Sequence, residues 1–245
     1  REEPALSSAN ATPVIEARGL GHVYAGGVAA LADVTVTVNS GEFVAVLGRN
    51  GAGKTTFARH LNGLLRPTSG EVLIGGAPSA GRQVSELAMQ VGYVFQNPDH
   101  QIFANSVREE VGYGLGNLGW EADRIAERVD DVLEQVGMRD LADRHPFNLG
   151  KGQRQRLAVA SVLALSPQVL VIDEPTTGQD WLGARAMMSL VRELNESGHT
   201  IMMITHDMPL VAEPPRRAPV SAEAPLIADP NPHHLSGRGH LVDVG

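Results

Sequence analysis

The sequence has 245 residues, of which 42% are hydrophobic and 20% charged, and its formal net charge is −8 at pH 7. This acidic balance argues against nucleic acid as a main partner, and the lack of cysteine excludes disulfides, zinc ribbons and thiol catalysis. No apolar run approaches the roughly 20 residues that a membrane-spanning helix needs. The length fits one α/β domain with an inserted lobe.

The beginning of the chain predicts a linker followed by strands. Residues 1–13 are rich in alanine, serine and proline and lack the apolar core of a signal peptide. The chain starts with Arg1 rather than methionine, which leaves open that it is a piece of a longer protein. Residues 30–38 alternate valine with threonine, as in a half-exposed strand, and residues 43–47 are continuously apolar, as in a strand buried on both faces.

The next part of the chain alternates between helical and strand-like patterns. A helical spacing occupies residues 55–65, and short strands are expected at residues 71–74 and 91–95. Residues from about 97 to 150 contain several helical stretches, so we expect an inserted helical lobe there.

Beyond the lobe, helices are expected at residues 153–165 and 184–194, and buried strands at 169–172 and 201–204. Strands that alternate with helices predict a mostly parallel sheet. Residues 212–245 hold six of the fifteen prolines and show little periodicity, so we predict an atypical tail that is disordered or poorly packed.

The string GRNGAGKTT, which begins at Gly48, is a glycine-rich turn between a predicted strand and a predicted helix. Its backbone N–H groups and the dipole of the following helix would bind phosphate oxygens. Lys54 would reach the β- and γ-phosphates of ATP, and the Thr55 hydroxyl would hold Mg²⁺. The residues of the turn that we expect to bind ATP are Gly48, Asn50, Gly51, Gly53, Lys54, Thr55 and Thr56.

Polar residues follow three of the predicted strands directly. Asp173 ends an apolar strand, where a carboxylate is costly unless it meets water or a cation, so we expect it to hold Mg²⁺. Glu174 would orient or deprotonate the attacking water. His206 would bind the γ-phosphate or that water, and the amide of Gln96 would touch Mg²⁺ or water.

The string LGKGQ begins a predicted helix and forms a second candidate anion site. One ATP cannot lie on two helix N-termini that are far apart in the fold. We therefore expect this string to meet the ATP of a second subunit, with two ATPs sandwiched in a two-fold dimer. Its residues are Leu149, Gly150, Lys151, Gly152 and Gln153.

These strings, in this order, resemble those of the ABC-type ATPases, the nucleotide-binding domains of ABC transporters, over residues 14–211. The resemblance implies a P-loop NTPase core of RecA-like α/β type with a mostly parallel sheet, a small antiparallel β subdomain and an inserted helical signature lobe. It makes Gln96 the Q-loop residue, Glu174 the catalytic carboxylate and His206 the switch histidine. It also places Asp180 in the D-loop and Tyr24 where the family stacks an aromatic ring on adenine.

A narrower resemblance lies in the segment QNPDHQIF, which begins at Gln96 and is similar to the energy-coupling-factor group of importers. That group imports vitamins and transition-metal ions. The resemblance implies a second ATPase domain, a membrane coupling protein and a substrate-binding membrane protein as partners, and a peripheral place on the cytoplasmic face of the membrane. The Gln96 segment and the helical lobe would be the contact surface, and no nucleic acid partner is expected.

Three departures from the family pattern raise alternatives. Gly150 replaces the usual serine of the signature and Gln179 replaces a leucine of the D-loop. After Glu213 the sequence no longer follows the family pattern, so we expect the sheet to lack the family's final strands. Because the serine hydroxyl contacts the partner's ATP, one alternative is a regulatory half that binds ATP and hydrolyses it weakly. Another is a soluble ABC-type ATPase that acts on DNA or ribosomes, although the coiled-coil or zinc insertion of such proteins is lacking between Lys54 and Leu149.

Overall fold

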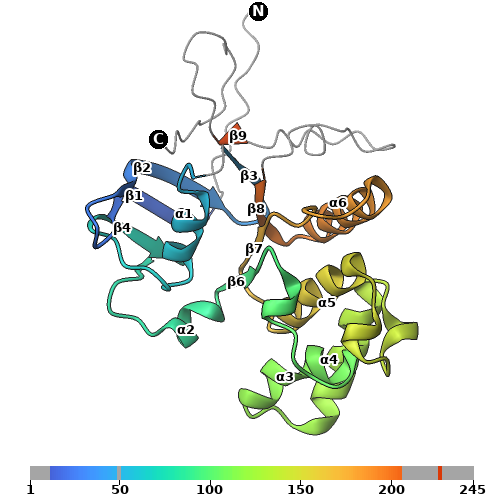
Figure 1. The fold of residues 1–245 in the computed structure, drawn as a ribbon. Coiled ribbons are helices and arrows are strands. Elements are labelled where there is room, and N and C mark those ends of the chain that lie inside the picture. Colours follow the sequence, from blue (N-terminus) through green and yellow to red (C-terminus); the bar gives the residue numbers. More distant parts are fainter. Residues whose placement is uncertain (1–11, 49–50, 206–225, 228–245) are drawn as a thin grey trace, which may run out of the picture.

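The computed structural model describes residues 12–48, 51–205 and 226–227, which form two β-sheets with helices around them (Figure 1). Residues 1–11, most of the predicted tail, Asn50 and His206 lie outside the described residues. Among the described helices, none is both long and apolar enough to cross a membrane.

The larger sheet is entirely parallel and carries the strands that end at the candidate site. Its strand order is β6-β7-β8-β3-β9. Three strands predicted from continuous apolar runs are confirmed: β3, β7 and β8. The bounds are β3 Phe43–Leu47, β6 Val91–Val94, β7 Val169–Asp173, β8 Thr200–Thr205 and β9 Leu226–Ile227.

The smaller sheet is antiparallel, with the order β2-β1-β4-β5. Its strands are β1 Pro13–Val23, β2 Ala29–Asn39, β4 Ser69–Ile74 and β5 Ala77–Pro78. Valines of β2 are buried while the threonines between them are exposed, which is the alternation that the sequence predicts for a half-exposed strand. The two sheets together confirm the predicted fold class.

Six α-helices lie in the described part of the chain, and for two of them the residue that begins the helix can be recognised from its side chain. Side chains cap two of them: Ser106 accepts a hydrogen bond from the N–H of Glu109, and Asp180 accepts one from the N–H of Gly183. Helices α3 and α4 lie together at one end of the molecule, away from the antiparallel sheet (Figure 1). The bounds are α1 Lys54–Leu61, α2 Val84–Ala88, α3 Val107–Asn117, α4 Ala122–Gln135, α5 Lys151–Ala164 and α6 Trp181–Glu196.

The hydrophobic core has two parts, one on each face of the parallel sheet. Because successive side chains of a strand point to opposite faces, Val169 and Val171 of β7 pack toward α1 and the antiparallel sheet. Leu170 and Ile172 pack on the other face, against the cluster formed by α3, α4, α5 and α6. The sheet is therefore covered on both sides, and only its strand ends reach the surface.

Close packing between β6 and α5 fixes the strand that leads to Gln96. Gly92 of β6 lies against Val162 of α5 and Pro167, and a methyl group in place of its hydrogen would overlap with both side chains. A larger residue at this position would force the strand and the helix apart.

We expect Gly92→Ala to lower the free energy of unfolding by about 1–3 kcal/mol, the usual effect of overpacking a core. Urea denaturation measures this loss. Gly116→Ala is the matched control, because Gly116 lies in α3 and its added methyl group would meet nothing within 4 Å. The control should be neutral or more stable by up to about 1 kcal/mol. Equal stability of the two variants would contradict the close packing described here.

Candidate nucleotide-binding site

The predicted phosphate turn joins the end of β3 to the start of α1. Gly51 and Gly53 have φ angles of +88° and +84°, which glycine adopts without steric cost. Gly53 also lies against the backbone of Ala30, where a side chain would overlap. The Nζ atom of Lys54 donates a hydrogen bond of 2.7 Å to the carbonyl oxygen of Gly48, which ties the two ends of the turn together.

A cavity of about 340 Å³ opens beside this turn, a size within the range of small-molecule sites. It brings together most of the residues predicted to bind or hydrolyse ATP. The signature residues 149–153 and Asp180 do not line it. The predicted residues that do line it are Tyr24, Gly51, Gly53, Lys54, Thr55, Thr56, Gln96, Asp173 and Glu174.

Asp173 is one of two buried acidic residues that line the cavity, the other being Glu174, and 5% of its surface is exposed. Its Oδ2 atom accepts a hydrogen bond of 2.6 Å from the Tyr93 hydroxyl and a longer one of 3.4 Å from the Thr55 hydroxyl. Burial raises the pKa of Asp173 and the charge of Glu174 raises it further, while Tyr93, Thr55 and Lys54 act in the opposite direction. The ionised carboxylate is thus only partly compensated by its protein neighbours.

The donor atoms of this region fit Mg²⁺. The Thr55 hydroxyl, the Asp173 carboxylate and the Gln96 amide offer hard oxygen ligands on one cavity. A divalent cation would also offset the cost of the buried charge on Asp173. The described residues include no cluster of three or more His, Cys, Asp or Glu side chains, as expected for an ion that completes its shell with phosphate and water.

Glu174 lines the same cavity because the backbone turns sharply after β7. Adjacent residues of an extended strand point to opposite faces, so Asp173 and Glu174 could not both face the cavity in a regular strand. Glu174 instead has a φ of +46°, a left-handed conformation that is unfavourable for a residue with a side chain. Its N–H donates to the carbonyl oxygen of Ile204 at 2.8 Å, which holds the turn against β8. Such local strain is typical of functional sites.

The predicted adenine platform, Tyr24, is anchored to the helix that follows the phosphate turn. Its hydroxyl forms a hydrogen bond of 2.9 Å with the Thr56 hydroxyl. Its ring meets His22 edge to face at 4.6 Å between centroids. With 40% of its surface exposed, the ring keeps a face that a base could stack on.

A pair of buried histidines lies behind Tyr24, and the sequence analysis did not single it out. His60 Nδ1 lies 2.7 Å from the carbonyl oxygen of Thr56, which can only accept, so Nδ1 carries the proton. In the neutral ring Nε2 then accepts a hydrogen bond from His22 Nδ1 at 3.1 Å. The four-residue spacing of Thr56 and His60 on a helix could have suggested the first contact, but nothing in the sequence places His22 there.

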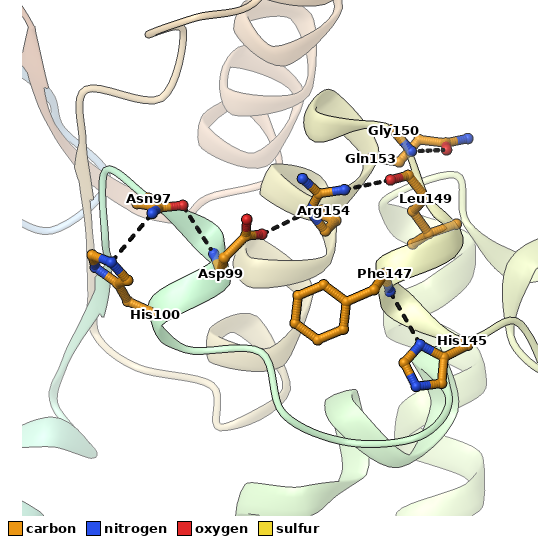
Figure 2. A network of polar contacts seen from close by, with 9 residues as sticks. All are labelled: Asn97, Asp99, His100, His145, Phe147, Leu149, Gly150, Gln153 and Arg154. Atoms are coloured by element: carbon orange, nitrogen blue, oxygen red, sulfur yellow. Dashed lines mark hydrogen bonds and ion pairs between the residues drawn. The ribbon is translucent and has the colours of Figure 1, made fainter.

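The signature string begins α5, with Gly150 in the N-cap position (Figure 2). None of its residues lines the cavity. The N–H of Gly150 donates to Gln153 Oε1 at 3.1 Å. The guanidinium group of Arg154 donates a hydrogen bond of 2.5 Å to the carbonyl oxygen of Leu149 and forms an ion pair of 2.7 Å with Asp99. The ion pair ties the segment after Gln96 to the signature helix.

The signature helix also packs against the segment that follows Glu174. The ammonium group of Lys151 lies over Gly178, where a side chain would overlap with it. The Oε1 atom of Gln179 lies beside Gly152, and its amide nitrogen donates to the carbonyl oxygen of Pro175 at 2.7 Å. Asp180 caps α6 next to this contact. The signature and the predicted D-loop therefore form one continuous surface, separate from the cavity.

Comparison with known proteins gives consistent matches. Residues 31–177 match the family model described as ABC transporter. The energy-coupling factor transporter ATP-binding protein EcfA of Methanocaldococcus jannaschii is 45% identical over 200 residues, which cover 81% of this chain and 72% of that protein. A solved structure of CbiO1 from Clostridium perfringens, described as part of the ABC transporter complex CbiONQ, has a TM-score of 0.78. It is 36% identical, and the match covers 82% of this chain and 81% of that one.

A further relative, from Caldanaerobacter subterraneus subsp. tengcongensis, is longer than this chain. It is 48% identical over 200 residues, which cover 82% of this chain but 35% of that protein, and its name contains the words ABC transporter ATP-binding protein. The chain thus spans about a third of the length of this relative and of two similar ones from Methanosarcina species.

The buried pair of His22 and His60 predicts how the free energy of unfolding depends on pH. Burial, followed by the charge of His22, lowers the pKa of His60, while backbone hydrogen bonds raise it. The unfolded chain therefore takes up a proton before the folded one as the pH falls below about 6.5. The free energy of unfolding should fall as the pH drops below about 6.5 toward the lower pKa of the folded state, by up to about 1.4 kcal/mol per pH unit for one proton. His60→Gln should flatten this decline in urea titrations, whereas His100→Gln, at an exposed position, should not.

Proposed function

The chain belongs to the ABC transporter family of ATP-binding proteins, and from this premise we propose that it is the ATP-hydrolysing subunit of a membrane importer of the energy-coupling-factor type. The ATP-binding domains of this family are ATPases. The observation that carries the proposal is the cavity that unites the phosphate turn, Asp173 and Glu174. The similarity to EcfA and CbiO1 supports the type of importer.

In the proposed reaction each residue of the cavity has a separate task. The backbone N–H groups of the turn would bind the phosphates, and the three donors of Lys54 would allow it to contact the β- and γ-phosphates from its place beside the carbonyl oxygen of Gly48. Thr55 and Asp173, with Gln96, would hold Mg²⁺, which would supply charge neutralisation to the phosphates. Glu174 takes a proton from the attacking water, and His206, outside the described residues, orients that water or the γ-phosphate.

The signature surface supports a dimer in this proposal. Residues 149–153 lie at the start of α5 but do not line the chain's own cavity. A second ATPase domain, from another copy or a related chain, would place its ATP against this helix N-terminus, and this chain's ATP would meet the partner's signature. Lys151 would supply a positive charge there, whereas Gly150 provides no hydroxyl group.

An apolar groove on the helical lobe supports contact with a membrane subunit. It has a volume of about 560 Å³, lies between α3 and α4, and includes the exposed rings of Phe103 and Tyr113, which meet edge to face at 4.5 Å. The buried Glu110 carboxylate accepts hydrogen bonds from the N–H groups of Phe103 and Ala104 at 2.9 and 2.8 Å. Phe103 is thus held in place on the surface, as expected for a contact residue. The chain would sit on the cytoplasmic face of the membrane.

The role of Glu174 is tested by Glu174→Gln. The amide keeps the size of the side chain but cannot accept the proton of water, so ATP hydrolysis should fall at least about 100-fold. Binding of a fluorescent ATP analogue should stay within about twofold of wild type. Normal hydrolysis by the variant would reject Glu174 as the base, and absence of hydrolysis by the wild-type chain, alone and with its partner subunits, would favour a regulatory half.

The role of the groove is tested by Phe103→Ser in the protein purified gently from native membranes. We expect the variant to lose its membrane subunits, which mass spectrometry identifies in the wild-type complex, while ATP binding stays unchanged. Leu64→Ser is the matched control, because Leu64 is an exposed apolar residue outside the groove. If Phe103→Ser retains the same subunits in the same amounts as Leu64→Ser, the groove is not the contact surface.

A further inference from the structure

Tyr93 contacts Asp173 but does not line the nucleotide cavity. It lies on β6, whose register pairs it with Val171, two residues before Asp173 on β7. Its hydroxyl donates the hydrogen bond of 2.6 Å to Asp173 Oδ2. Because Tyr93 stands inside an otherwise apolar strand, where an aromatic residue is expected as core, the sequence gives no signal of this contact.

We propose that Tyr93 is a positioning residue that fixes the Asp173 carboxylate for Mg²⁺ binding. The proposal rests on the proposed function, since it assigns Asp173 to Mg²⁺. Tyr93 occupies one lone pair of Oδ2, so the remaining lone pairs of the carboxylate would stay available to the cation or to a water molecule bound to it.

The geometry favours an orienting role over a merely space-filling one. A hydrogen bond from a hydroxyl to a carboxylate is strong at 2.5–2.7 Å, so the 2.6 Å contact restrains a side-chain torsion that is otherwise broad. The other donor to Oδ2, the Thr55 hydroxyl, is 3.4 Å away and is itself assigned to Mg²⁺. If the Thr55 hydroxyl were to bind the cation instead of Asp173, the Tyr93 hydroxyl would remain as the close donor to Oδ2.

Tyr93 also links the cation site to the segment that would face the membrane partner. Its ring packs against Phe95, with the two ring centroids 5.1 Å apart. The N–H of Phe95 donates a hydrogen bond to Gln101 Oε1 at 2.8 Å, and its carbonyl oxygen accepts one from the side-chain amide of Gln155 of α5 at 3.2 Å. The position of Asp173 is therefore tied to the residues on both sides of Gln96.

The test is Tyr93→Phe in the whole chain, with Tyr113→Phe as the matched control. Tyr113 is exposed in the groove, so its variant removes a hydroxyl far from Asp173. Binding of a fluorescent ATP analogue is measured in EDTA and then during titration with Mg²⁺. We expect Tyr93→Phe to raise the half-saturating Mg²⁺ concentration about tenfold, as is usual when a residue that supports a metal ligand is changed. Binding in EDTA should stay unchanged, and the control should match wild type in both measurements.

Three outcomes would overturn the proposal: an unchanged Mg²⁺ midpoint, a lower midpoint, or an equal loss of binding with and without Mg²⁺. The last result would indicate that Tyr93 only supports the fold. Whatever the titration shows, we expect Tyr93→Phe to lose some thermal stability, because the buried Asp173 carboxylate then has one hydrogen-bond donor fewer. Should Tyr93→Phe fail to fold, the same titration is run on Tyr93→Gln, which also lacks the tyrosine hydroxyl; we expect a higher Mg²⁺ midpoint than in wild type, and an unchanged midpoint would overturn the proposal. If wild-type protein shows no effect of Mg²⁺ on ATP binding, it is the proposed function that fails.

Discussion

The site depends on one constraint, the placement of an ionisable carboxylate at the buried end of an apolar strand. Asp173 lies at the C-terminal end of β7 between β6 and β8, where burial opposes its ionisation. Three neighbours offset this cost in part: Tyr93 from β6, Thr55 from α1 and Lys54 from the phosphate turn. Strand β6 and the start of α1 thus meet at one carboxylate on β7, and a cation bound beside it would complete the compensation.

The two places where we propose that ATP phosphates bind lie apart in the described structure. The phosphate turn and the acidic residues share one cavity, whereas the start of α5 does not line it and contacts Asp99 through Arg154 and Gly178 through Lys151. In the proposed dimer, each copy would contribute its cavity to one ATP and its signature to the other. This is why a second ATPase domain enters the proposed reaction.

Features set by local sequence were predictable, and features set by contacts across the fold were not. Strands β3, β7 and β8 could be read from continuous apolar runs, because strands covered on both faces need apolar side chains at every position. Helix α5 begins two residues earlier than the periodicity indicated, at the glycine cap of the signature. The contacts of Tyr93 with Asp173 and of His22 with His60 join residues that are 80 and 38 positions apart, so no local pattern contains them. The roles assigned to the site residues, among them Asn50 and His206 outside the described part of the chain, remain predictions.

The hydrogen bond between Lys54 and the carbonyl oxygen of Gly48 bears on what it costs to order the turn around a ligand. An ammonium group carries three N–H donors, so the lysine can keep this 2.7 Å contact while it also donates to a phosphate oxygen. The contact restrains a long side chain whose ordering on binding would otherwise cost free energy. In the proposed reaction, part of this entropy loss is therefore taken when the chain folds, before ATP arrives.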